Sequence, residues 1–138
     1  MTDIADNILL DVQHLKVHFQ LPRRNLFAKP SKVHATDDVS FQIKRGTTLG
    51  LVGESGSGKT TAALAVMRLT PITGGAMRLG DTDLVALKGE ALRQARSRMQ
   101  IIFQDPYSSL NPRDRAGAIV REPMDLMNIG QPGERDGH

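Results

Sequence analysis

The residues best suited to chemistry lie between Gly53 and Thr60, where the chain reads GESGSGKT and fits the pattern G-x-x-x-x-G-K-[ST]. Glycines lack a Cβ atom, so the backbone can curl until successive N–H groups surround a phosphate. Gly58 would open a helix whose positive end favours an anion. Lys59 would place its charge on the β- and γ-phosphates, and the Thr60 hydroxyl would bind Mg²⁺. The spacing therefore predicts a nucleotide-phosphate loop rather than a chance run of glycines.

A second polar group stands at Gln104, directly after the apolar run MQIIF at residues 99–103. That run predicts a buried strand. The carboxyl ends of strands in an open α/β sheet face the ligand crevice, so Gln104 would point toward a γ-phosphate if its strand lay beside the loop. The amide could hold Mg²⁺ or a water with one end and donate with the other. The alternative is an ordinary residue at the end of a strand.

Several short elements must position these groups. Residues 48–52 (TLGLV) predict a strand buried on both faces, and residues 58–69 predict a helix after the loop. Apolar and polar side chains alternate over 9–20 and 38–44, which predicts two antiparallel strands with one wet face. The order of strand, glycine loop, helix and second buried strand indicates the α/β class. The other expected elements are a loop or hairpin excursion at 21–32, strands near 76–79 and 83–86, and helices over 88–98 and 115–128, the last bent at Pro123.

Composition excludes several kinds of site. The chain has no cysteine, which excludes a disulfide framework, a cysteine metal site and a thiol nucleophile. Its four histidines form no ligand-spaced cluster in the sequence. His14 and His18 stand four residues apart, as a metal pair on a helix would. They alternate with apolar residues, however, and are expected to be solvent-facing residues of a strand.

The charge balance gives little support to a nucleic-acid partner, because the net charge is only +3. Arg93, Arg96 and Arg98 could contact phosphates, but an apolar stripe beside them predicts that they form the solvent face of a helix. We expect no nucleic-acid binding. The start of the chain lacks the features of a signal peptide, and no stretch approaches the ~20 apolar residues of a membrane span. A cytoplasmic chain is expected, with any membrane role supplied by a partner.

The two motifs together resemble a known family. GESGSGKTT (53–61) paired with IIFQDPYSSLNPR (101–113) is similar to the ATP-binding subunits of ABC transporters. Within these it resembles the oligopeptide/dipeptide importer group, some members of which handle nickel or glutathione. The stretches LLDVQHLKVHFQLP and DDVSFQIKRGTTLGLV are similar to that group as well. The loop at 21–32 resembles that of the second ATPase subunit of such importers, and the resemblance extends from about residue 9 to about residue 130.

The resemblance implies a site for ATP and Mg²⁺. Lys59 and Gln104 would be the catalytic residues, and Thr60 and Gln104 would bind the magnesium. An aromatic side chain upstream of the loop normally stacks on adenine in this family; Val33-His34 stands near that place and Phe27 lies in the preceding loop, so no single residue is selected. The Walker A loop would consist of Gly53, Glu54, Ser55, Gly56, Ser57, Gly58, Lys59, Thr60 and Thr61.

The resemblance also implies an architecture and an assembly. The fold would be a P-loop NTPase core, the ABC nucleotide-binding domain, with an N-terminal antiparallel β subdomain. Residues 1–46 would form the antiparallel β region, 47–104 the P-loop α/β core, and 105–138 the Q-loop and the start of the helical subdomain. The partners would be transmembrane permease subunits, a second ATP-binding subunit arranged head to tail and, indirectly, an extracytoplasmic solute-binding protein. The place would be peripheral, on the cytoplasmic side of the inner or plasma membrane.

Three motifs of the family have no counterpart after the loop. No four apolar residues precede an Asp-Glu pair, no LSGGQ signature occurs, and no histidine stands in a switch position. We therefore interpret the chain as the N-terminal half of such a domain, truncated in the helical subdomain. Two functions stay open: an ATP-binding subunit that powers the import of peptides or related small solutes, and a catalytically inactive nucleotide-binding fragment with no transport role. The sequence does not indicate the solute.

Overall fold

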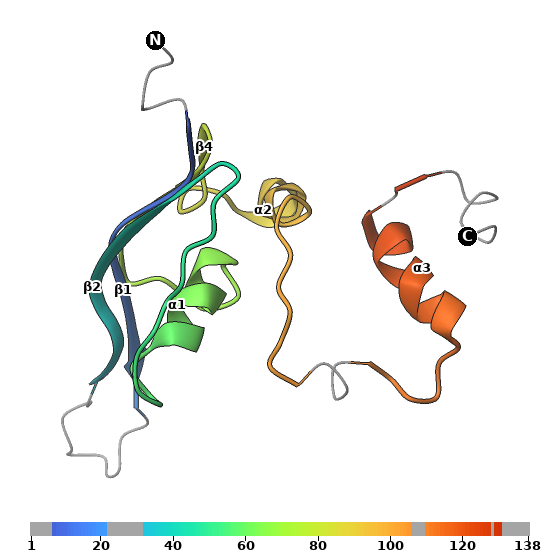
Figure 1. Cartoon of the computed structure of the whole chain (residues 1–138), viewed down its shortest axis with the longest axis horizontal. Helices are drawn as coiled ribbons and strands as arrows, with labels where there is room; N and C mark the ends of the chain where they lie inside the picture. Colours follow the sequence, from blue (N-terminus) through green and yellow to red (C-terminus); the bar gives the residue numbers. More distant parts are fainter. Residues whose placement is uncertain (1–6, 22–31, 106–109, 128, 131–138) are drawn as a thin grey trace. The chain divides into compact units, whose positions relative to one another are not determined.

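The structure is a computed structural model that describes residues 7–21, 32–105, 110–127 and 129–130. The chain divides into two compact units, Met1–Arg98 and Met99–His138. The first unit contains an antiparallel four-stranded sheet in the order β2-β1-β3-β4, with the long strands β1 and β2 side by side (Figure 1). The strands are β1 (Ile8–Gln20), β2 (Lys32–Lys44), β3 (Gly74–Leu79) and β4 (Thr82–Asp83).

The two alternating segments at the start of the chain form antiparallel strands, as predicted. Leu15 and Val17 of β1 are fully buried. In β2 the apolar residues of the alternation are half-buried and the polar residues between them are exposed. β2 begins at Lys32, six residues earlier than the alternation indicates. The predicted excursion at 21–32 lies almost entirely outside the described residues.

The core of the first unit lies between the sheet and the helices α1 (Lys59–Val66) and α2 (Gly89–Arg96). Both helices were expected, and α1 ends before Pro71 and the glycine pair that opens β3. The strand β4 is only two residues long, because the Asp83 carboxylate accepts hydrogen bonds from the N–H groups of Val85 and Ala86 and turns the chain. The buried apolar residues are Leu10, Val12, Leu15, Val17, Ala62, Ala65, Met77, Leu79, Leu84 and Ala95.

The second unit contains the helix α3 (Ala116–Met127), with Pro123 inside it, close to the predicted 115–128. No residue of α3 is buried. Among the helices that the structure describes, none combines the length and the apolar character that crossing a bilayer requires.

Two predicted buried strands are absent from the described residues. Residues 48–52 and 99–103 have no strand conformation, and Val52 and Ile102 are each 90% exposed. Both segments have the composition of parallel strands, which need a neighbouring strand on each side and helices over both faces. Within the first unit, residues 48–52 pair with neither β2 nor β4, the two edge strands of the described sheet. The prediction was wrong because apolar composition selects a buried strand only where a partner strand lies alongside.

Candidate functional site

The predicted phosphate loop lies between the extended segment before it and the helix α1. Its glycines adopt the backbone conformations that the loop requires: φ is 81° at Gly56 and 91° at Gly58, where side chains are disfavoured. Between them the Ser57 N–H donates to the Glu54 carbonyl oxygen at 3.2 Å and tightens the turn. Gly58 is the N-cap of α1 and passes the chain directly into the helix. Left-handed residues next to right-handed ones form the nests of N–H groups that bind anions.

Strand β2 supports the loop from one side. A Cβ atom on Gly58 would overlap the backbone carbonyl oxygen of Ala35, so only glycine fits this approach. The Thr36 hydroxyl, which is buried, donates a long hydrogen bond of 3.5 Å to the Gly58 carbonyl oxygen. The same oxygen accepts the first helical hydrogen bond of α1, from Ala62 N–H at 2.8 Å. The sheet therefore fixes the point at which loop becomes helix.

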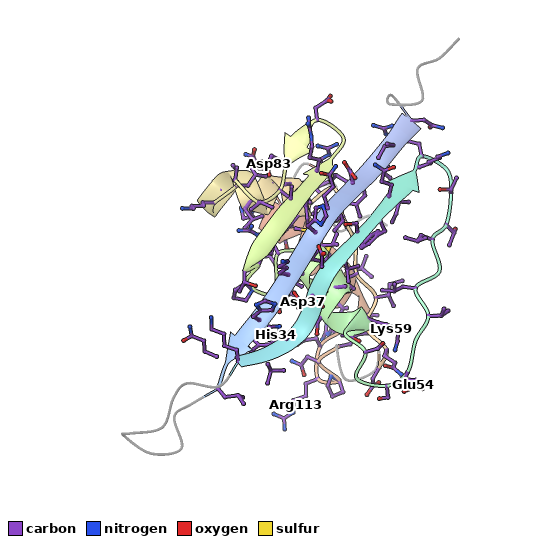
Figure 2. All side chains as sticks on the ribbon, turned by 90° about the vertical axis from the view of Figure 1, so that its left-hand side faces the viewer. His34, Asp37, Glu54, Lys59, Asp83 and Arg113 are labelled. Carbon is purple, nitrogen blue, oxygen red and sulfur yellow. The ribbon has the colours of Figure 1, made fainter. Side chains whose placement is uncertain are left out.

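The Lys59 side chain lies over its own loop, with Lys59 and Glu54 close together at the loop in Figure 2. Its ammonium group donates to the carbonyl oxygens of Gly53 at 2.7 Å and Glu54 at 2.5 Å, and to the Ser57 hydroxyl at 3.2 Å. A cation held at the centre of a glycine loop, at the positive end of a helix, forms an electrostatic site for a phosphate group.

A hollow of about 350 Å³ lies between the loop and β2. Its walls are Gly53, Ser57, Gly58 and Lys59 of the loop, Ala62 of α1, Leu51 and Val52 before the loop, and residues 34–37 and Val39 of β2. Sequence reasoning found the loop wall and missed the β2 wall. The sequence carried no signal for Thr36, which precedes the alternating stretch at 38–44; its burial and its hydrogen bond to Gly58 appear only in the fold.

The remaining predicted site residues divide between the two units. Thr60 is exposed and Thr61 half-buried in the first turn of α1, and Glu54 and Ser55 are exposed in the loop. Gln104 is exposed and belongs to the second unit. It does not follow a strand, so the geometric reason given for its role was wrong, whereas the role itself stays a prediction. Val33-His34 lies on β2, and His34 lines the hollow; Phe27 lies outside the described residues.

The arginines of the α2 segment correct one further prediction. Arg93 and Arg98 are exposed as expected, but Arg96 is half-buried. Its guanidinium donates to the carbonyl oxygens of Met67 at 3.0 Å and Arg68 at 2.5 Å, at the C-terminal end of α1. A cation there satisfies carbonyl groups that the helix leaves open and complements its dipole. Arg96 thus caps the C-terminal end of α1, the helix whose N-terminal end follows the phosphate loop.

Comparison with known proteins identifies the family. The sequence model described as ABC transporter matches residues 36–128, which include the whole loop and most of the chain. The chain belongs to the ABC transporter family.

Relatives within the family carry names that concern peptides. The chain is 42% identical over 132 residues to a putative peptide import ATP-binding protein of Brucella ovis, matching 96% of this chain and 39% of the relative. It is 45% identical over 117 residues to a probable peptide ABC transporter ATP-binding protein of Sinorhizobium fredii, over 85% of this chain and 33% of that one. It is 43% identical over 119 residues to the oligopeptide transport ATP-binding protein OppF of Salmonella typhimurium. This match covers 85% of this chain and 36% of OppF. The chain therefore spans between 33% and 39% of the length of these relatives.

Solved structures show the same fold. The ATP-binding cassette MJ0796, described as a dimer in a post-hydrolysis state bound to ADP and Pi, superposes with a TM-score of 0.73 at 23% identity. The match covers 93% of this chain and 53% of that one. A second dimeric structure of this bacterial ABC transporter cassette matches equally well. The predicted fold class, an ABC ATPase cassette with an antiparallel β subdomain, is confirmed.

Proposed function

We propose that this chain binds Mg-ATP through residues 53–61, as the nucleotide-binding part of an ABC importer for peptides or related small solutes. The observation that carries the proposal is the Lys59 ammonium, held over the loop at the N-terminal end of α1 and lining the hollow beside β2. Family membership and the relatives named for peptide import or oligopeptide transport support peptides as the class of solute.

Different residues of the loop bind different groups of the triphosphate. The left-handed glycines let backbone N–H groups approach the phosphate oxygens, and the Lys59 charge offsets the charge of the β- and γ-phosphates. Binding draws the ammonium from its own loop carbonyls to a stronger, ionic acceptor. Thr60, in the first turn of α1, presents its hydroxyl to Mg²⁺, and Gln104 contributes at the γ-phosphate and the magnesium. The nucleoside takes the hollow between the loop and β2.

The assembly we propose follows from the family. Two ATP-binding subunits pair head to tail on the cytoplasmic side of the membrane and bind the transmembrane permease subunits, which receive solute from an extracytoplasmic binding protein. The dimeric cassettes that share the fold are consistent with such pairing. Nucleic acid has no part in this function.

The test of nucleotide binding is calorimetric titration with Mg-ATP, comparing Lys59→Ala with Lys88→Ala. Lys88 is an exposed lysine at the N-cap of α2 and serves as the control for lost charge. Charge-assisted hydrogen bonds contribute about 1.5–3 kcal/mol each, so Lys59→Ala should weaken binding at least tenfold. Equal affinities for the two variants would refute the phosphate-loop assignment.

A second candidate is nucleotide binding without turnover and without a transport role. It rests on the chemistry of the loop residues, which supply contacts for phosphate and magnesium. Hydrolysis requires a group beside the γ-phosphate that positions or deprotonates water, and neither Lys59 nor Thr60 is suited to this. We expect no phosphate release by this polypeptide with Mg²⁺ and excess ATP. Turnover at about 1 per second or more, absent from Lys59→Ala, would exclude the second candidate.

A further inference from the structure

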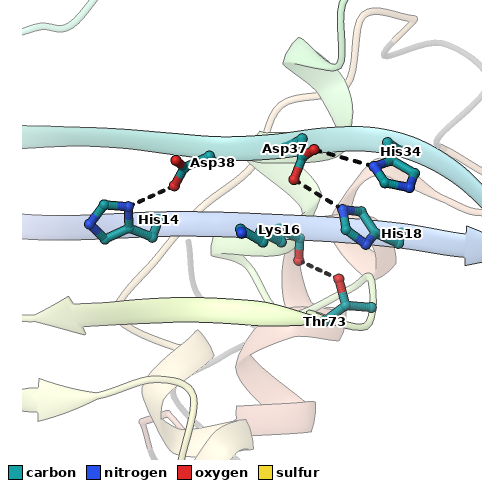
Figure 3. Close-up of polar contacts among 7 residues, drawn as sticks. All are labelled: His14, Lys16, His18, His34, Asp37, Asp38 and Thr73. Carbon is teal, nitrogen blue, oxygen red and sulfur yellow. Dashed lines mark hydrogen bonds and ion pairs between the residues drawn. The ribbon is translucent and has the colours of Figure 1, made fainter.

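A cluster of two histidines and one aspartate lies on β1 and β2 (Figure 3). His18 of β1 stands opposite His34 of β2, and their rings stack with centroids 4.0 Å apart. The Asp37 carboxylate accepts from both: His18 Nε2 donates to Oδ1 at 3.2 Å, and His34 Nδ1 donates to Oδ2 at 3.2 Å. These hydrogen bonds hold the pKa of Asp37 below its usual range. The spacing of the histidines along the sequence gave no sign of this cluster, because its members come together only where β1 pairs with β2.

An irregularity in β2 brings the three side chains together. Val17 pairs with Thr36 and His18 pairs with His34, so β2 has one extra residue, Ala35, at this point. Side chains alternate between the faces of a regular strand, and residues three apart point to opposite sides. The extra residue reverses that parity, as β-bulges do. His34 and Asp37 consequently share one face, and that face also carries His18.

The set of ligands suits a transition-metal ion. One atom from each residue lies within 4.8 Å of the others. Two ligand atoms bound to one tetrahedral Zn²⁺ at about 2.0–2.2 Å lie about 3.3–3.6 Å apart. The two nitrogen–oxygen distances of 3.2 Å are already close to that spacing. Imidazole nitrogens favour Zn²⁺, whereas Mg²⁺ prefers oxygen ligands alone.

The cluster is also accessible from solvent. The His18 side chain is 20% exposed, His34 is 53% exposed and Asp37 is 51% exposed. Three protein ligands on an open face leave a fourth position for water or another donor, as in zinc sites that are not purely structural. Because the ligands come from two neighbouring strands, a bound ion would tie β1 to β2.

We propose that His18, His34 and Asp37 form a binding site for Zn²⁺ or a chemically similar divalent transition metal. The ion lies between the two ring nitrogens and the carboxylate, and each neutral imidazole then carries its proton on its other ring nitrogen. None of the three ligands belongs to the loop at 53–61, but His34 and Asp37 also line the hollow that we assign to the nucleoside, so the two proposed sites share the β2 wall.

The test is a calorimetric titration of the metal-free 138-residue chain with Zn²⁺, together with thermal unfolding in the same solutions. The variants are His34→Gln and Asp37→Asn, each of which removes one ligand from an exposed position. The matched control is His14→Gln. His14 forms a similar pair with Asp38 on the same two strands, at 2.6 Å, but the described part of the chain places no third ligand beside it.

We expect one Zn²⁺ per chain and a rise in the unfolding temperature with Zn²⁺ but not with Mg²⁺. His14→Gln should bind as the unchanged chain does. His34→Gln and Asp37→Asn should each lose at least about tenfold in affinity, since even residues that only support a metal ligand cost that much. Absence of Zn²⁺ binding by the unchanged chain would overturn the proposal. So would binding that survives in both ligand variants, or binding that is lost in His14→Gln.

Discussion

Replacing Gly58 by alanine tests how the sheet supports the phosphate loop. The new methyl group would meet the carbonyl oxygen of Ala35 in an overlap that only a backbone shift relieves, and the Thr36 hydroxyl at 3.2 Å. Residue 58 has a φ of 91°, which L-residues with a side chain adopt at a cost of about 1–2 kcal/mol. Gly58→Ala therefore combines a conformational penalty with a packing penalty.

Gly56→Ala separates these two effects. Gly56 has a similar φ of 81°, but no atom lies within 4 Å of the position where its Cβ would stand. The Gly56→Ala substitution should lower the free energy of unfolding by about 1–2 kcal/mol, through the backbone conformation alone. Forcing an extra methyl group into a packed contact costs a further 1–3 kcal/mol, roughly. Gly58→Ala should thus lower the free energy of unfolding by about 2–5 kcal/mol, a large share of the 5–15 kcal/mol typical of domains.

Urea unfolding followed by circular dichroism measures both changes. With a typical slope of about 1–3 kcal/mol per molar urea, the midpoints of the two variants should differ by about 1 M. The comparison has a clear negative result. If Gly58→Ala is no less stable than Gly56→Ala, the carbonyl of Ala35 does not contact Gly58, and β2 does not support the loop.

Three further predictions concern residues outside the loop. Arg96→Ala should lower the free energy of unfolding by about 1–3 kcal/mol, because two carbonyl groups at the end of α1 lose their donor; Arg98→Ala, which removes one exposed hydrogen bond, should cost less in the same urea titration. Gln104→Ala should weaken ATP binding more than ADP binding by calorimetry, whereas equal losses would indicate a general structural role. The hydrogen bond from Arg93 holds the pKa of Glu90 below its usual range, so Arg93→Gln should raise that pKa in an NMR titration. The stabilisation that this pair provides is present above about pH 4.3 and is lost as the pH falls through the lower, folded-state pKa; an unchanged Glu90 pKa would contradict this.

The sequence predicted the local backbone structure around the loop at 53–61. The glycines and the lysine of the loop act through local backbone geometry, which spacing along the chain encodes directly. The alternation in β1 likewise depends on neighbouring residues only, and it gave the buried positions Leu15 and Val17. Helix α1 followed from the absence of glycine and proline between Lys59 and Val66.

Features that depend on distant partners could not be predicted. The run at 99–103 has strand composition, but among the described residues no strand pairs with it, and composition alone does not supply a partner. Arg96 belongs to the polar side of α2 by periodicity, and only the position of α1 makes it a cap. The histidine–aspartate cluster depends on the extra residue at Ala35, which changes the register without any local sign such as glycine. Register is a property of two strands, and one strand's pattern does not contain it.

The exposed apolar segment at 48–52 has a consequence for how this polypeptide behaves in concentrated solution. Leu49, Leu51 and Val52 are 44%, 49% and 90% exposed, and the segment belongs to no strand of the described sheet. An extended apolar segment can add itself to the open edge of another copy's sheet, and β2 is such an edge. Because donor segment and acceptor edge are different surfaces, this pairing does not close on itself and grows into open-ended assemblies. A net charge of +3 opposes growth only weakly and is screened by salt, so precipitation should begin at lower protein concentration as ionic strength rises.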